Sequence, residues 1–197
     1  MTRVISPIEQ QSYEILRSRV DTSALPPCTK AVVERVIHAS ADLSYLGDLV
    51  CAEADLAVGA QALRDGAPVV ADSAMTAAGI TAHEVICRID DRHAAALARV
   101  VGITRAAAGI RVAGGEVGPG AVWVIGTAPT ALADLLLRGP APALVIGLPV
   151  GFVGAVEAKQ ALRDSGLPAL TNRSEKGGAA VAAAALNALL YLEEPAR

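Results

Sequence analysis

The sequence predicts an α/β fold in which a mainly parallel sheet is flanked by helices, as in a Rossmann-like three-layer domain. Residues 122–159 carry this prediction, because they hold two strand–turn–helix units in tandem. Each unit begins with a short, continuous apolar run, which is typical of a strand buried on both faces of a parallel sheet. Each run stops at a glycine that a proline soon follows, and proline is favoured in the first turn of a helix.

Composition sets the size of the fold. The chain has 197 residues, 53% of them hydrophobic, which is enough for one good-sized core, so a single domain over 1–197 is expected. Only 3% of the residues are aromatic, and the core must therefore be built from Ala, Val, Leu and Ile. The net charge of −3 and the lack of a basic cluster argue against binding to nucleic acid or to a membrane surface.

Several common kinds of site are not expected. Cys28, Cys51 and Cys87 are widely spaced and form no CxxC pair or Cys/His cluster, so neither a metal site nor a disulfide framework is indicated. Reduced cysteines and the lack of a signal-peptide core favour a cytoplasmic protein. The alanine-rich run 179–192 is too short to span a bilayer. Without a G-x-G-x-x-G or Walker A motif, NAD and ATP are poor candidates as cofactors.

The first helix is expected over Ile8–Val20, and a serine lies on its apolar stripe, which comprises Ile8, Ile15, Leu16 and Val20. This serine, Ser12, has two interpretations. Its hydroxyl bonds its own backbone where two helices pack closely, or it faces a ligand. The pattern alone leaves both open.

The second helix is expected over Thr29–Leu43, with an apolar stripe made of Val32, Val33, Val36 and Ile37. His38 points away from that stripe. Glu34 and Asp42 lie one turn to either side of His38, and their negative charge would favour the protonated imidazole and raise its pKa. His38 is therefore a candidate general acid, and the alternative is a surface histidine in ordinary helix charge pairs.

Predicted helices and strands follow one another through the middle of the chain. Helix is expected over Leu46–Arg64 and Asp91–Ala108, and strand over Pro68–Asp72 and Val85–Ile89. Arg105 lies near the end of the second of these helices. There it either interacts favourably with the helix C-terminus or is reserved for a substrate carboxylate.

Two polar residues and one glycine-rich stretch complete this part of the chain. Asp72 and Thr81 each either cap the following helix or face a ligand. Gly114–Gly120 is expected to be a loop that precedes the next strand, and a dinucleotide-binding loop would have to follow a strand instead.

Three loops are expected to meet at one edge of the sheet, each after a predicted strand: 126–130 after Val122–Ile125, 147–151 after Leu144–Ile146, and 173–178 after Leu167–Thr171. Open α/β sheets bind ligands at the carboxyl ends of their strands. The first two loops would present free backbone N–H groups at helix N-termini, which favours an anion, and Arg173 and Lys176 add positive charge. The alternative is ordinary loop chemistry in a doubly wound sheet.

Blocks of residues along the whole chain resemble a known family. They include the segments 35–39 (RVIHA), 125–132 (IGTAPTAL), 146–159 (IGLPVGFVGAVEAK) and 176–178 (KGG). In this order they are similar to precorrin-8X methylmutase of cobalamin biosynthesis and to its cobalt-precorrin-8 counterpart. The blocks 125–132 and 146–159 are long and specific.

The resemblance implies a parallel α/β fold that works as a homodimer, with no organic cofactor and no metal ligands. It implies an isomerase that moves a methyl group from C11 to C12 of a tetrapyrrole (corrinoid) substrate, giving hydrogenobyrinate, or cobyrinate if cobalt is already in place. His38 would be the catalytic proton donor and acceptor. Substrate contacts would fall on Ser12, Arg35, Thr81 and Arg105. The product would be handed to the next pathway enzyme, and the alanine-rich terminal helix is a candidate for the dimer interface.

The chain departs from the family pattern between Thr81 and Val85. Only three residues stand there, where the family usually has several more, and one of them is His83. We expect the shorter loop to alter the pocket beside Thr81, and we take His83 to be incidental. Two other functions remain consistent with the residues. One is a non-catalytic corrinoid carrier, and the other is an unrelated α/β protein that binds a phosphate-bearing ligand.

Overall fold

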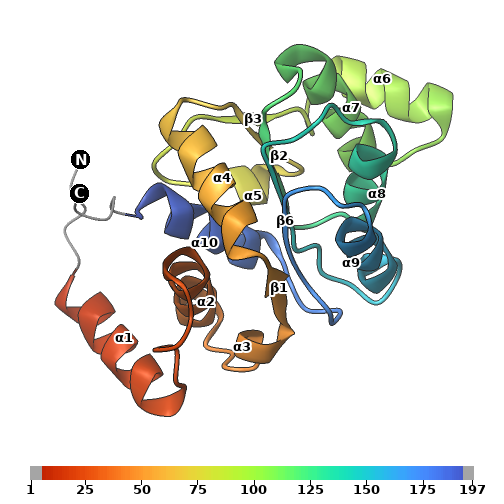
Figure 1. The fold of residues 1–197 in the computed structure, drawn as a ribbon. Helices are drawn as coiled ribbons and strands as arrows, with labels where there is room; N and C mark the ends of the chain where they lie inside the picture. The colour runs from red at the N-terminus through yellow and green to blue at the C-terminus, as the bar shows by residue number, and fades with distance from the viewer. Residues whose placement is uncertain (1–5, 193–197) are drawn as a thin grey trace.

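The computed structural model describes residues 6–192, which contain a six-stranded sheet (Figure 1). The strand order is β1-β6-β5-β4-β2-β3, and neighbouring strands are parallel except β1 with β6. The strands are β1 (Leu49–Cys51), β2 (Val69–Ala71), β3 (Val85–Cys87), β4 (Val122–Ile125), β5 (Leu144–Gly147) and β6 (Ala169–Asn172). The mainly parallel sheet predicted from the sequence is confirmed.

Helices cover both faces of this sheet. One face packs against α4 (Glu53–Arg64), α5 (Ala74–Ala78) and α10 (Ala179–Leu190), and the other against α7 (Arg105–Val117), α8 (Pro129–Arg138) and α9 (Ala155–Asp164). Three further helices lie outside these layers or at their edge: α2 (Pro27–Ser40) on α10, α1 (Pro7–Arg19) on α2, and α6 (Arg92–Val101) on α7. The short α3 (Tyr45–Asp48) leads into β1. The first face thus extends outward through α10 and α2 to α1.

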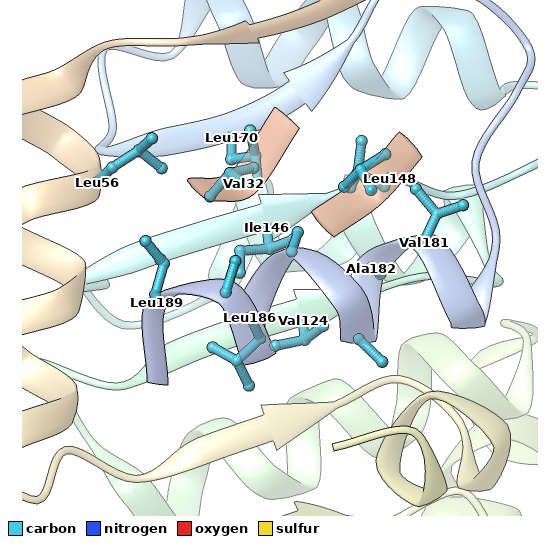
Figure 2. Packing of buried hydrophobic residues seen from close by; sticks show 14 of the residues in the cluster. Val32, Leu56, Val124, Ile146, Leu148, Leu170, Val181, Ala182, Leu186 and Leu189 are labelled. Atoms are coloured by element: carbon cyan, nitrogen blue, oxygen red, sulfur yellow. The ribbon is translucent and has the colours of Figure 1, made fainter. Parts of the chain in front are cut away.

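Alternation along the strands divides the core between the two faces. Val122 and Val124 of β4 belong to the cluster that α2, α4 and α10 cover, whereas Trp123 and Ile125 belong to the cluster under α7, α8 and α9. Figure 2 shows Leu186 of α10 beside Val124 in the first cluster. The strands are therefore buried on both faces, as their continuous apolar runs predicted.

The predicted helix over Leu46–Arg64 is wrong where the strand β1 separates the short helix α3 from α4. β1 is an antiparallel edge strand, and its Val50 pairs with Thr171 of β6. A strand of three residues is too short to show a period, and its partner is remote in the sequence. The local pattern therefore gave no indication of it.

The predicted helix over Asp91–Ala108 is also wrong, because Gly102 ends α6 in the left-handed conformation, with φ 72°, and α7 begins at Arg105. The expected loop Gly114–Gly120 is helical up to Val117. Glycine at 114 allows close packing, because a Cβ there would lie 3.3 Å from Cδ of Pro140, which is a tight contact. Close packing between elements, rather than a loop, explains this glycine.

Helix α10 belongs to the core. Its residues from Ala179 to Leu189 are nearly all buried between the sheet and α2, so the expectation that it forms a dimer interface is wrong. Between residues 6 and 192, none of the helices combines the length and the hydropathy that a membrane crossing needs. Within the same part of the chain, no group of three or more His, Cys, Asp and Glu side chains could hold a metal ion.

Candidate active site

Two helices bring together the first pair of candidate residues. Ser12 on α1 lies with its Oγ 2.8 Å from Nδ1 of His38 on α2. The ring of Tyr13, the next residue of α1, stacks on the imidazole at a centroid separation of 5.0 Å and an interplanar angle of 15°. The half-buried His38 is thus held at one ring nitrogen and along one ring face, which fixes its orientation. The Ser12 hydroxyl therefore contacts a side chain of a neighbouring helix, which is neither of the two interpretations that the sequence offered for this serine.

Glu34, expected to flank His38, bonds to Arg17 of α1 and to Thr22 in the turn that follows α1. Its carboxylate is buried and accepts hydrogen bonds from Nη2 of Arg17 at 2.7 Å and from Oγ1 of Thr22 at 2.5 Å. Burial acts to raise the pKa of Glu34, but these hydrogen bonds outweigh burial and lower it. Glu34 therefore fastens α2 to α1 and to the turn between them.

Arg35 of α2 lines a cavity of about 550 Å³ between α1, α2 and α10. Its Nη1 donates to Oε1 of Glu9 at 2.6 Å and lies 3.5 Å from the hydroxyl oxygen of Tyr13. Burial acts to lower the pKa of Arg35, but the contacts with Tyr13 and Glu9 outweigh it and raise the pKa. Since Tyr13 both lines the cavity and stacks on His38, the imidazole lies one aromatic ring away from the cavity.

Thr81 borders the same cavity through Tyr191, which follows α10. The two hydroxyl oxygens are 2.9 Å apart, and the Thr81 backbone N–H donates to Oδ1 of Asn187 at 3.3 Å. Tyr191 is one of the residues that line the cavity. Thr81 therefore lies one side chain away from the cavity, at the amino end of β3, and it does not cap a helix.

Arg105 lies in a different part of the molecule. It is the first residue of α7, so the interpretation as a charge near a helix C-terminus is wrong. Its Nη2 donates to the carbonyl oxygen of Ile89 at 2.8 Å and lies 3.3 Å from Oδ1 of Asp90. Helix α7 covers the face of the sheet opposite α10 and α2 (Figure 1), so a single chain does not bring Arg105 to His38.

The turn after β4 holds an anion that the protein itself supplies. Asp72, only 2% exposed at the end of β2, accepts the backbone N–H groups of Gly126 at 3.1 Å and of Thr127 and Ala128 at 2.8 Å each. β2 and β4 are neighbours where the strand order reverses, which is the usual ligand crevice of such a sheet. The predicted free anion site at this turn is wrong, because Asp72 occupies it.

The turn after β5 also differs from its prediction. Pro149 is not in the first turn of a helix, because α9 begins only at Ala155. The intervening segment leaves Phe152 97% exposed and Val153 89% exposed. Two large apolar side chains in water at one loop mark a surface suited to contact with another molecule.

The loop 173–178 is held in place by a buried lysine. Lys159 of α9 donates from Nζ to the carbonyl oxygens of Ser174 at 2.7 Å and Lys176 at 2.5 Å. Burial lowers the pKa of Lys159 to about 8. Lys176 in turn donates to Asp42 at 2.7 Å, one turn beyond His38, and this bond lowers the pKa of Asp42 to about 2. The second carboxylate expected beside His38 is thus paired with a lysine.

Sequence reasoning missed Glu9 and Tyr13, which contact the two candidate residues of α2. Glu9, Ser12 and Tyr13 stand at positions i, i+3 and i+4 of α1, the spacing that places side chains on one helix face. The same spacing on α2 relates Arg35 to His38. The matching spacing of polar residues on two consecutive helices could have indicated that these two faces contact each other.

Comparisons with known proteins find relatives over nearly the whole chain. Residues 7–192 match the precorrin-8X methylmutase family. The chain is 40% identical to the precorrin-8X methylmutase of Pseudomonas aeruginosa, over 92% of this chain and 93% of that protein. It is also 40% identical to the cobalt-precorrin-8 methylmutase of Methanothermobacter thermautotrophicus, over 95% of this chain and 93% of that protein.

The fold agrees with a solved structure of the same kind. A crystal structure of a precorrin-8X methylmutase from Thermus thermophilus superimposes with a TM-score of 0.84, at 33% identity and with 93% of each chain covered. The chain therefore belongs to the precorrin-8X methylmutase family, whose members are isomerases of cobalamin biosynthesis.

Proposed function

We propose that the protein is a cytoplasmic isomerase that moves a methyl group from C11 to C12 of precorrin-8X and yields hydrogenobyrinate, with His38 as proton donor and acceptor. The observation that carries this proposal is the setting of His38. Its imidazole is oriented by Ser12 and Tyr13 and lies one aromatic ring away from a cavity whose wall holds Arg35. A general acid must be held in a defined orientation to protonate a macrocycle at a chosen position.

The proposed reaction needs a proton and a fixed geometry. Protonation by His38 makes the conjugated ring electron-poor, and the bond from C11 to the methyl carbon breaks as the bond to C12 forms. The proton then returns to His38, so substrate and product have the same atoms. The contribution of the protein is the position of the acid and stabilisation of the charge that develops on the ring.

Arg35 and Thr81 are the proposed contacts for carboxylates of the substrate. A guanidinium is suited to carboxylates because it offers several N–H donors in one plane. Arg35 lines the cavity, and Thr81 adjoins it through Tyr191. Arg105 can join them only from a second chain, because its own chain keeps it on the opposite face of the sheet.

We therefore propose a homodimer in which the exposed apolar loop around Phe152 and Val153 is covered. Sedimentation analysis should give twice the chain mass. Phe152→Ser should shift the protein toward the monomer, whereas Val100→Ser, which changes a residue 86% exposed on α6, should not. A wild-type chain that sediments as a monomer would contradict the homodimer.

The experiment that tests the proposed reaction is a turnover assay on precorrin-8X and on cobalt-precorrin-8 with catalytic amounts of protein. Both substrates are needed because relatives of both names match this chain at 40% identity. His38→Ala should abolish turnover while hydrogenobyrinate still binds. His93→Ala is the matched control, because His93 lies at the exposed start of α6 and should be dispensable.

The outcomes separate the proposed enzyme from a carrier. An enzyme converts many equivalents of substrate, whereas a carrier binds hydrogenobyrinate and forms no product at any ratio of protein to substrate. Near-normal turnover by His38→Ala would reject His38 as the proton donor and leave the isomerase assignment in place. Transfer of bound hydrogenobyrinate to the next pathway enzyme can be followed in the same assay.

A further inference from the structure

We propose that Glu9 is a built-in competitor for the carboxylate site at Arg35 and that it sets how tightly a polycarboxylate macrocycle binds. This inference rests on the proposed function, because it takes Arg35 to be a substrate contact. It concerns a residue that the family resemblance does not assign.

The geometry places Glu9 at one of the N–H groups of Arg35 that a ligand carboxylate could use. Its Oε1 lies 2.6 Å from Nη1 of Arg35, and the two side chains are only 13% and 18% exposed. Both residues line the cavity between α1, α2 and α10. The guanidinium therefore already has a carboxylate partner, and a second carboxylate can accept the N–H that Nη1 donates to Glu9 only by displacing the first.

Displacement does not require the rest of the site to move. Glu9 lies in the first turn of α1, one turn before Ser12, so rotation of its side chain leaves the contact between Ser12 and His38 unchanged. The first turn of α1 is open to solvent on its other side, since the neighbouring Ile8 is 81% exposed. The Glu9 side chain, itself only 13% exposed, can move toward that side when another carboxylate replaces it.

The exchange leaves the cavity with one more negative charge, because the displaced Glu9 carboxylate stays attached to α1. Glu14, Glu34 and Arg17 line it together with Glu9 and Arg35. When a substrate carboxylate replaces Glu9 at Arg35, one ion pair takes the place of another, and the net gain is smaller than for an unpaired arginine. Glu9 therefore weakens the binding of any anionic ligand at this point and favours release of the carboxylate-rich product.

The test is the affinity for hydrogenobyrinate, measured by the change in its visible absorbance on titration. Glu9→Gln removes the competing charge and should bind about tenfold more tightly than the wild type. Glu14→Gln is the matched control, because it removes the same charge from the same cavity, while its partner is Gln10 rather than Arg35. Its affinity should stay within about twofold of the wild type.

Two further variants guard against misfolding and indirect effects. Glu9→Asp keeps the charge but is too short to keep the 2.6 Å contact, so it should also tighten binding. In an Arg35→Met background, Glu9→Gln should have no effect on affinity, because the guanidinium for which Glu9 and the ligand compete is absent.

The possible results separate this inference from the proposed function. If the wild type binds hydrogenobyrinate and Glu9→Gln binds it no more tightly, Glu9 is not a competitor, and the proposed function is unaffected. Equal tightening by Glu14→Gln would also overturn the inference, since it would show a general charge effect. If neither the wild type nor Glu9→Gln binds the macrocycle, the proposed function fails and this inference fails with it.

Discussion

Ser12 Oγ lies 2.8 Å from His38 Nδ1, although the two residues are 26 positions apart and belong to different helices. The contact makes the orientation of the imidazole depend on the docking of α1 onto α2. Since Tyr13 holds the ring face and Glu34 bonds Arg17, helix α1 is part of the candidate active site.

We predict that Ser12→Ala lowers kcat about tenfold and leaves the affinity for hydrogenobyrinate within about twofold. The imidazole would lose the hydrogen bond that orients it, while the groups that contact carboxylates stay in place. The pH dependence of kcat should shift as well, because Nδ1 loses its partner. Ser18→Ala is the control, since the Ser18 hydroxyl bonds the backbone of α1 at Ile15. Equal kcat values for Ser12→Ala and Ser18→Ala would contradict the orienting role.

The buried Lys159 should make stability depend on pH. Its pKa is lowered from 10.5 to about 8, so between these values the unfolded chain binds more protons than the folded one, and the free energy of unfolding rises with pH. Relative to Lys159→Met, the wild type should gain on the order of 3 kcal/mol as the pH rises through this window. Urea unfolding at several pH values measures the difference. Lys30→Met corrects for the loss of a lysine charge, and parallel curves for wild type and Lys159→Met would disprove the prediction.

The hydrogen bonds that Asp72 accepts at the turn after β4 should stabilise the folded protein. In Asp72→Asn, an amide NH₂ group replaces one carboxylate oxygen and meets backbone N–H donors at Gly126 or Thr127. We expect the free energy of unfolding to fall by about 3 kcal/mol. Asp65→Asn, at an exposed carboxylate bonded by Gln61, should change it by less than about 0.5 kcal/mol. Similar unfolding curves for the two variants would show that Asp72 does not fasten the β4 turn.

Two glycines inside helices should respond to alanine in opposite directions. A Cβ at the buried Gly59 would lie 2.5 Å from Cδ2 of Leu144, so Gly59→Ala should destabilise the protein by about 2 kcal/mol. Around the exposed Gly115 of α7, nothing lies within 4 Å of the added carbon, so Gly115→Ala should stabilise it by about 0.7 kcal/mol. Thermal unfolding gives both signs. A stabilising Gly59→Ala would mean that β5 and α4 can separate at small cost.

The parts of the fold that sequence predicted are those with long, regular patterns. The strands β4 and β5 were predictable because their apolar runs are continuous, and α2 because its stripe from Val32 to Ile37 has a clear helical period. The break between α6 and α7 and the helical Gly114 were not predictable. Both depend on what packs against the glycine, and a single sequence does not contain that information.

In the candidate site, too, local patterns predicted some features, and others depended on tertiary packing. His38 was found from its place on α2, but its partners lie on α1, and no spacing within one helix could reveal them. The anion-binding turn after β4 was correctly placed at the end of a strand, yet its N–H groups bond Asp72, which comes from the neighbouring strand. Sequence patterns therefore located the polar groups, and only the tertiary structure showed which of them are already satisfied.

The strand order has a consequence for how the chain folds as it is synthesised. Among the described residues 6–192, β1 pairs only with β6, and α2 packs on α10, so two elements that are synthesised early need the two that are synthesised last. A nascent chain that has not yet reached Ala179 leaves Val32 and Val36 of α2 uncovered, together with one side of β4. Chaperone binding should therefore persist until α10 has left the ribosome. A chain that lacks α10 should not fold, instead of forming a shorter folded protein.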